Sequence, residues 1–214
     1  ANSQIAPSVS TSPTGSVVSW VASGRSENNA TTYVGMFQQT NNTGTLVGDN
    51  TLVNNLETGN VETISSCVLN NGNIVFVWSQ DVNTATDYEI YYRIFDSSGV
   101  PLGNQAKAPA SVRLNAVVGS VVALTNGGFA VVWASPTTGT YSVDGYDVMY
   151  RRFNSSGVAV DVSDVTVSTS LAGHQTYPKA CASGDGFAVA WLDYATSLET
   201  RVYNVKCRVF DSSG

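Results

Sequence analysis

The run Phe129-Ala130-Val131-Val132-Trp133 is followed, after a polar loop, by a second run at residues 149–153 and then by Asn154-Ser155-Ser156-Gly157. Both runs are rich in β-branched and aromatic residues and have the length of ordinary strands. Asn and Gly supply the positive φ angles that tight turns require. The stretch therefore predicts two neighbouring antiparallel strands and a turn that leads into another.

The same plan occurs four times along the chain. All four tryptophans, Trp20, Trp78, Trp133 and Trp191, end the apolar strand, and their spacings are 58, 55 and 58 residues. A Tyr/Arg/Phe strand follows each of them, at residues 33–37, 91–95, 149–153 and 206–210, and three of these continue into Asp/Asn-Ser-Ser-Gly. Two linked motifs that recur in register near a period of 57 residues indicate an internal repeat.

Each repeat is expected to form four antiparallel strands; in the second they fall near 62–69, 73–80, 87–95 and 100–106. A four-stranded unit of this period is typical of a β-propeller blade, because one blade cannot bury both faces and must stack on its neighbours. The sequence therefore predicts a single all-β domain over 1–214, with repeats of approximately 1–57, 58–113, 114–171 and 172–214. A β-solenoid, or two sandwich domains of about 110 residues each, stays open as an alternative.

The repeats resemble the Gly-Phe-Val-Val-Trp … Tyr-Arg-Phe-Asp-x-x-Gly type of β-propeller repeat, which occurs in tandem in large secreted and surface proteins. The resemblance covers nearly the whole chain, through the four Trp strands and the three Ser-Ser-Gly turns quoted above. It implies a fold and says little about chemistry, because these motifs are structural.

The last repeat ends at Gly214, before a fourth strand can form. We therefore expect the last blade to lack its outer strand, either because the chain is an excerpt of a longer propeller or because the strand comes from elsewhere. An open edge can accept a strand from another molecule. The expected partners are therefore copies of this chain or further repeats, added at the C-terminal edge to build a fibre or tandem array.

Composition excludes several functional classes. The chain has 10 Lys and Arg against 16 Asp and Glu, a net charge of −6, and charged residues make up only 12%. Scattered basic residues do not neutralise a phosphate backbone or an anionic membrane surface, so neither nucleic acid nor membrane is expected as a partner.

Residues for catalysis or metal binding are scarce. His174 is the only histidine, and no Gly-x-Ser-x-Gly motif accompanies it, so we expect a solvated loop residue rather than part of a triad. Zinc would need several closely spaced His or Cys ligands, so no metal or cofactor is expected. Acidic residues flank the loops between the second and third strands and offer weaker hypotheses, calcium binding or a glycosidase pair, although loop carboxylates are usually just solvated. These are Asp81, Asp87, Glu89, Asp144, Asp147, Asp193 and Glu199.

Aromatic residues in the same loops suggest a ligand surface on one rim. Tyrosine faces beside amide and hydroxyl groups are suited to binding sugars, while the alternative is that they only pack on the rim. The candidate residues are Tyr88, Tyr141, Tyr146 and Tyr194.

Three arginines share one aligned position, Arg93, Arg151 and Arg208. We expect them to pair with turn aspartates or to donate to loop carbonyls rather than to bind a ligand. Cys181 and Cys207 are expected on strands one and three of the last unit, about 9.5 Å apart with a strand between them, too far for a disulfide. Cys67 has no obvious partner.

Three sequons, at Asn29, Asn41 and Asn154, and the low Lys content favour an extracellular protein. The function that the sequence favours is a non-enzymatic extracellular structural or adhesive glycoprotein, a repeating unit of a fibre or tandem array. The alternative is a carbohydrate-binding, lectin-like propeller.

Overall fold

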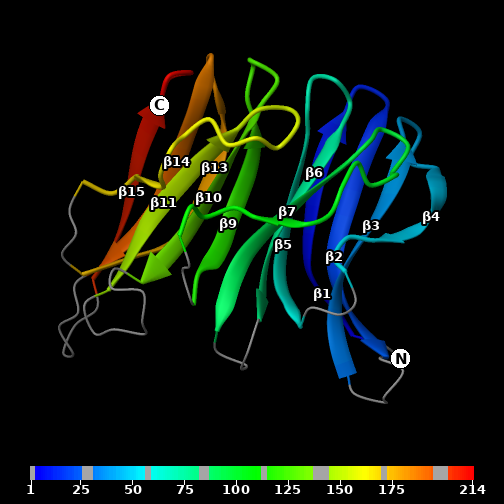
Figure 1. The fold of residues 1–214 in the computed structure, drawn as a ribbon, viewed down its shortest axis with the longest axis horizontal. Coiled ribbons are helices and arrows are strands. Elements are labelled where there is room, and N and C mark those ends of the chain that lie inside the picture. Colours follow the sequence, from blue (N-terminus) through cyan, green and yellow to red (C-terminus); the bar gives the residue numbers. More distant parts are fainter. Residues whose placement is uncertain are drawn as a thin grey trace.

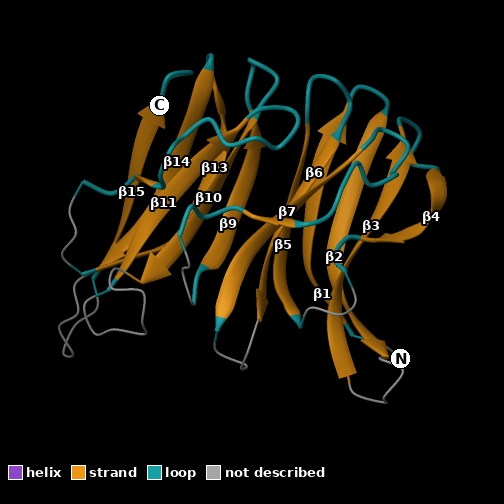
Figure 2. Cartoon of the chain, in the orientation of Figure 1, coloured by secondary structure: helices purple, strands orange, loops and turns teal. Residues whose placement is uncertain are grey.

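The computed structural model describes residues 3–25, 31–55, 59–81, 87–111, 115–136, 145–169, 173–194 and 202–214. The described residues form fifteen strands and no helix (Figure 2). Consequently, no helix in the described part of the chain could cross a membrane.

The strands form four separate antiparallel sheets, each built from one consecutive stretch of chain. The first sheet contains β1 (Gln4–Ser12), β2 (Gly15–Arg25), β3 (Thr31–Asn41) and β4 (Leu46–Leu52). The second contains β5 (Val61–Val68), β6 (Ile74–Asp81), β7 (Tyr88–Phe95) and β8 (Ala106–Lys107). The third contains β9 (Val117–Ala123), β10 (Phe129–Pro136), β11 (Tyr146–Phe153) and β12 (Val165–Thr166). The fourth contains β13 (His174–Ser183), β14 (Gly186–Tyr194) and β15 (Tyr203–Phe210).

The sheets follow one another in a row and lie face to face, with the first and fourth at opposite ends of the molecule (Figure 1). This arrangement confirms the predicted all-β fold of propeller-like blades, the last with three strands among the described residues. We therefore call the sheets blades one to four. The first strands of successive blades, β1, β5, β9 and β13, lie beside one another and are called the inner strands.

The core lies between blades. Three hydrophobic clusters form, one at each blade-to-blade interface, and each combines side chains of two neighbouring blades. Trp78, Trp133 and Trp191 are buried in these clusters, so each indole fills the gap between two blades. Trp20 is only half-buried, because no described blade covers that face of blade one.

The turn after the third strand has the same construction in all four blades. The side-chain oxygen of the first turn residue accepts two hydrogen bonds. One comes from the backbone N–H two residues ahead, and the other from the N–H three or four residues ahead. These first residues are Asn41, Asp96, Asn154 and Asp211. The expected alignment of the first unit was wrong here. Phe95 pairs with Ile74, four residues before Trp78, whereas Phe37 pairs with Ser19, one residue before Trp20. In blade one the residue equivalent to Phe95 is therefore Thr40, which pairs with Ser16. The strand continues three residues beyond Phe37 before its turn begins.

The fourth strands of blades two and three are shorter than expected, whereas β4 of blade one has seven residues. β8 and β12 have two residues each, and the segment expected at 100–106 makes one further bridge, from Pro101 to Phe95. An outermost strand has a neighbour on one side only, so weak pairing there costs the fold little.

Candidate functional site between the inner strands

A pocket of about 560 Å³ opens where the inner strands of blades two, three and four begin. Thr63 of β5, Gly119 of β9 and Tyr177 of β13 line it, together with Tyr146 and Tyr194 from neighbouring strands. We call it the inner-strand pocket. Its size lies within the range of ligand sites, and its lining comes from three repeats that are far apart in sequence.

Every inner strand carries a bulge at this end. The pairing with the second strand shifts between Ile5 and Ser8 in β1, between Val61 and Thr63 in β5, and between Thr176 and Lys179 in β13; in β9 Gly119 is the extra residue. Bulges bend a strand and redirect its side chains, and they are frequent beside binding sites. Here they shape the mouth of the pocket.

Two bulge residues hold special backbone positions. Tyr177 has φ of 52° and is 75% exposed, an uncommon conformation for a bulky side chain. Gly119 is required by close packing, because a Cβ there would lie 2.3 Å from the carbonyl oxygen of Pro178. β9 and β13 therefore approach each other through a glycine, and strain is retained at the pocket mouth.

An aromatic stack forms one wall of the pocket. The ring of His174 is stacked 5.0 Å from that of Tyr194 and 6.3 Å from that of Tyr146. Gly145 lets the two segments approach closely, since a Cβ there would lie 1.9 Å from the carbonyl oxygen of Gly173. His174 was expected to be a solvated loop residue, but it begins β13 and is half-buried.

The polar groups of the lining are partly unsatisfied. Nδ1 of His174 and Oγ1 of Thr176 are buried and make no hydrogen bond within the described part of the chain. Lys179 donates from Nζ to the carbonyl oxygen of Gly119, at 3.1 Å. Buried polar atoms are normally paired, so this wall offers hydrogen-bonding capacity to a ligand or to water.

The structure brings together two of the four predicted tyrosines. Tyr146 and Tyr194 flank His174, whereas Tyr88 lies in blade two and donates to Glu62 Oε1 at 2.7 Å. Burial, followed by the hydrogen bond to Glu62, raises the pKa of Tyr88 to about 12. Tyr141 lies outside the described residues. The sequence identified the tyrosines through their shared loop position, but nothing in it placed the histidine between two of them.

The predicted acidic residues are held within their own blades. Glu89 is buried and pairs with Lys107, at 2.6 Å, and Asp193 pairs with Lys206, at 2.7 Å. Burial opposes ionisation of Asp193, but hydrogen bonds from Lys206 and Gln175 outweigh it and lower the net pKa of that carboxyl. A general acid needs a raised pKa, so Asp193 does not fit that role.

The remaining members of the acidic set do not assemble a metal site. Asp81 accepts hydrogen bonds from Asn60, and Asp147 is buried near Ser168. In the part of the chain that the structure describes, no three His, Cys, Asp or Glu residues come together as metal ligands. Asp144 and Glu199 lie outside the described residues.

The three aligned arginines have the structural role that the sequence predicted. Each donates from Nη1 to a carbonyl oxygen in the segment that leaves the preceding blade, and each guanidinium lies near the ring of the phenylalanine two residues on. The pairs are Arg93 with Val53, Arg151 with Ala108 and Arg208 with Val167, at 3.1, 3.3 and 3.2 Å. They join successive blades rather than facing the pocket.

The cysteines are all free thiols. β14 lies between the strands that carry Cys181 and Cys207, which confirms the strand order on which their predicted separation depended. Cys67 is buried between blades two and three, and burial raises the pKa of its thiol.

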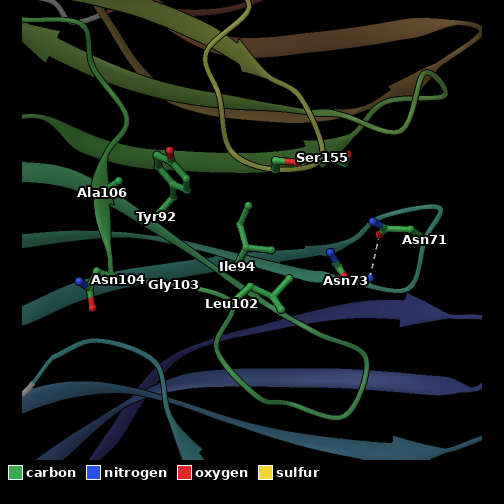
Figure 3. A pocket seen from close by; sticks show the side chains of 10 residues that line it. Asn71, Asn73, Tyr92, Ile94, Leu102, Gly103, Asn104, Ala106 and Ser155 are labelled. Atoms are coloured by element: carbon green, nitrogen blue, oxygen red, sulfur yellow. Dashed lines mark hydrogen bonds between the residues drawn. The ribbon is translucent and has the colours of Figure 1, made fainter.

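A second, more polar pocket of about 350 Å³ lies between blades two and three, away from the inner-strand pocket (Figure 3). Tyr92 and Ile94 of β7 face Ser155 of the next blade across it, and Asn73 lies beside them. Because the hydroxyl of Tyr92 already donates to Gly157 O at 2.7 Å, we interpret this pocket as part of the blade-to-blade contact.

Two of the three sequons lie within the described residues. Asn41 and Asn154 head the turns after β3 and β11, and both are exposed. Asn29 lies outside the described residues.

Comparison with solved structures finds this architecture in other proteins. A protein of unknown function from Dyadobacter fermentans gives a TM-score of 0.62 at 11% identity, over 90% of this chain and 50% of its own. The GH43 endo-arabinanase from Bacillus licheniformis gives 0.53 at 14% identity, over 99% and 75%. The xylan β-1,4-xylosidase from Bacillus halodurans gives 0.55 at 10% identity, over 97% and 41%. The chain thus spans half the length of the first of these proteins.

No protein-family model matches the chain, and no curated protein matches it significantly. Likeness at 10 to 14% identity shows the fold alone, a β-propeller fold that several glycoside hydrolases share. These neighbours overturn the expectation of a non-enzymatic structural or adhesive unit. The physical reason for the error is that blade motifs specify packing between sheets, whereas function depends on the residues at the pocket mouth.

Proposed function

We propose that the chain binds a saccharide in the inner-strand pocket and belongs to a carbohydrate-active propeller protein. The observation that carries the proposal is the stack of Tyr146, His174 and Tyr194 beside the unpaired Nδ1 of His174 and Oγ1 of Thr176. Flat rings accept the apolar face of a sugar, and nearby polar atoms pair with its hydroxyls. The glycoside hydrolases of the same fold support this choice of ligand.

Binding can be measured by calorimetry with soluble oligosaccharides of arabinan and xylan, the polysaccharides suggested by two structural neighbours. Tyr194→Ala and His174→Ala are expected to weaken binding by about tenfold or more, a loss of about 1.4 kcal/mol each. Tyr33→Ala is the aromatic control, because Tyr33 is a half-buried tyrosine of blade one that lies outside the pocket. Equal affinities for all three variants, or no binding by the wild type across both sugars, would refute the proposal.

Lysines offer a second matched pair. Lys179 lines the pocket and Lys107 lies on β8, where it pairs with Glu89. Lys179→Gln should weaken saccharide binding, whereas Lys107→Gln should leave it unchanged. Because both changes remove one positive charge, a difference between them reports position rather than net charge.

Hydrolysis of a glycosidic bond needs two carboxylates, one as acid and one as base or nucleophile. Glu62 is the extra residue of the β5 bulge, is exposed, and directly precedes the pocket residue Thr63. We assign Glu62 as one of the two. Release of reducing ends from arabinan or xylan by the wild type, and its loss in Glu62→Gln with retained binding, would support this role. Release that persists in Glu62→Gln would contradict it.

The finer resemblance to tandem repeats of large secreted proteins is also a proposal, supported by the four-fold repeat of the Trp strand and the Asn/Asp turn. With it we propose an extracellular location. We also propose that a further repeat or a second copy adds a strand at the open edge of β15. Secretion of the chain with glycans attached, when it is expressed behind a secretory leader, would support the location. Degradation or retention in the cell would count against it.

A further inference from the structure

The three blade-to-blade interfaces share one contact. The glycine that closes the turn of the following blade lies on a residue of the preceding third strand: a Cβ at Gly157 would lie 3.2 Å from the ring of Tyr92. At the equivalent places, a Cβ at Gly99 would lie 3.4 Å from Phe37, and one at Gly214 would lie 2.7 Å from Tyr150 Oη. At all three interfaces, therefore, the turn of one blade packs on the third strand of the preceding blade. We call the third-strand residues that receive the turn the socket.

Hydrogen bonds fasten the same socket. Gln39 Nε2 donates to the carbonyl oxygen of Ser97 at 3.0 Å, and Arg152 Nη1 donates to that of Ser212 at 2.8 Å. Gln39 and Arg152 occupy the same position of the third strand, two residues after Phe37 and Tyr150. Each interface thus joins a side chain of one blade to the turn backbone of the next.

Blade four presents this socket without an occupant among the described residues. The pairing of β14 with β15 places Cys207 where blade two has Tyr92, and Val209 where it has Ile94. Val205 and Val209 are 76% and 64% exposed, whereas their equivalents Ile90 and Ile94 are 0% and 8% exposed. An apolar strand face that is buried in two blades is open in this one.

Blade one presents the complementary surface. The turn headed by Asn41 is fully formed, with Gly44 at the position of Gly157, and a Cβ at Gly44 would meet nothing within 4 Å. On the same outward face Trp20 is half-buried and Val9 is 67% exposed, although the three other tryptophans are buried. Blade one therefore has a free turn and an uncovered indole.

We propose that blade one of a second copy of this chain docks on blade four, with the Asn41 turn seated on Cys207 and Val209. The contact continues the interface that already joins the blades of one chain. A head-to-tail contact closes when the rotation per unit permits. Two copies with two identical contacts would give eight blades, which is within the range of known propellers.

A disulfide trap tests the predicted pairing directly. In Figure 3, Ser155 of blade three faces Tyr92 and Ile94 of blade two. The equivalent residues at the proposed contact are Asn42 of one copy and Cys207 of the other. Asn42→Cys in a Cys181→Ser background, produced without N-glycosylation, is expected to form a disulfide-linked dimer under mild oxidation, whereas the third cysteine, Cys67, is buried.

Two control variants make the trap specific. Asn42→Cys with both Cys181→Ser and Cys207→Ser removes the predicted partner and should stay monomeric on a non-reducing gel. Ser97→Cys with Cys181→Ser places the new thiol on the same kind of turn in blade two. That turn already sits on the third strand of blade one within the same chain. Cross-linking of either control to the same extent as the test variant would overturn the proposal.

Sedimentation velocity measures the association without any cross-link. The wild type should show concentration-dependent dimers, and Val209→Asp should raise the dimer dissociation constant by about tenfold or more, because it places a charge in an apolar contact. Val162→Asp is the matched control, since Val162 is 96% exposed and belongs to blade three rather than to either end blade. A wild type that stays monomeric at all concentrations, or dimers equally sensitive to both changes, would refute the contact.

Discussion

The hydroxyl of Tyr92 donates a hydrogen bond to the carbonyl oxygen of Gly157, at 2.7 Å, and so joins the third strand of blade two to the turn of blade three. Tyr92→Phe removes only this bond and should lower the free energy of unfolding by about 1 kcal/mol. Urea denaturation followed by tryptophan fluorescence measures the change. Tyr33→Phe is the control, because its hydroxyl joins no following turn; an equal loss in both variants would contradict the assigned role.

The tryptophans are predicted to differ in solvent access although they occupy equivalent positions. Trp78 is fully buried and donates from Nε1 to Gln80 Oε1 at 2.9 Å, whereas Trp20 is half-buried. Acrylamide should quench one class of accessible indole in the monomer, and Trp20→Phe should remove that class. Trp78→Phe should instead lower stability by more than Trp20→Phe does, because it leaves a cavity and an unpaired glutamine. Equal quenching before and after Trp20→Phe would contradict the open face of blade one.

Strain at the pocket mouth predicts a trade between stability and binding. Tyr177 has φ of 52°, and asparagine adopts this conformation more readily than tyrosine does. Tyr177→Asn should therefore raise the free energy of unfolding by up to about 1 kcal/mol while weakening saccharide binding. Ala6 has φ of 50° at the equivalent bulge of blade one. Ala6→Asn should stabilise the chain without changing affinity, and a loss of affinity in this control would refute the role of Tyr177.

Stability should fall in alkaline solution as tyrosines ionise. Burial, followed by a hydrogen bond to a glutamate, raises the pKa of Tyr88 and that of Tyr91 to about 12. Between pH 10 and 12 the unfolded chain has lost these protons and the folded chain still holds them, so the free energy of unfolding decreases as pH rises. Denaturation midpoints at pH 9, 10 and 11 measure the slope, which should be shallower in Tyr88→Phe. An equal slope in the wild type and in Tyr88→Phe would show that ionisation of Tyr88 does not cause the loss of stability.

Two sequons are predicted to carry glycans when the chain passes through a eukaryotic secretory pathway. Asn41 and Asn154 are exposed, and in each the side-chain oxygen holds the turn while the glycan would attach to the nitrogen. Intact mass should show glycans at both of these sites, of which Thr43→Ala removes one and Ser156→Ala the other. A mass without glycans from a secreted sample would show that these turns are not recognised.

The internal repeat makes much of the fold predictable from the sequence. The Trp spacing identified four units, and the Asn/Asp-Ser-Ser-Gly turns located the end of three of the four third strands, because these motifs act through local backbone hydrogen bonds. The first unit was misaligned by three residues, since its turn is Asn41-Asn42-Thr43-Gly44 and lacks the Ser-Ser pair. The short outer strands were also missed, because pairing at an edge depends on few contacts.

The candidate site shows where sequence reasoning stops. Tyr146 and Tyr194 were found through their loop positions, but His174 was interpreted as a solvated residue because nothing near it in the sequence is chemically unusual. The structure stacks it on both tyrosines. A bulge, similarly, is a property of strand pairing, so Glu62 and Tyr177 gave no signal of their own.

Four antiparallel blades could be predicted from the residues alone, because the strands and turns of a blade follow one another within a period of about 57 residues. The side chains that meet between the inner strands, and the blade faces that stay open, become known only from the folded chain. Stacking brings residues of separate repeats within a few ångströms, and no local pattern records that distance. The pocket and the open faces are therefore properties of the assembled row of blades, where the hydrophobic effect, rather than any motif, selects the neighbours.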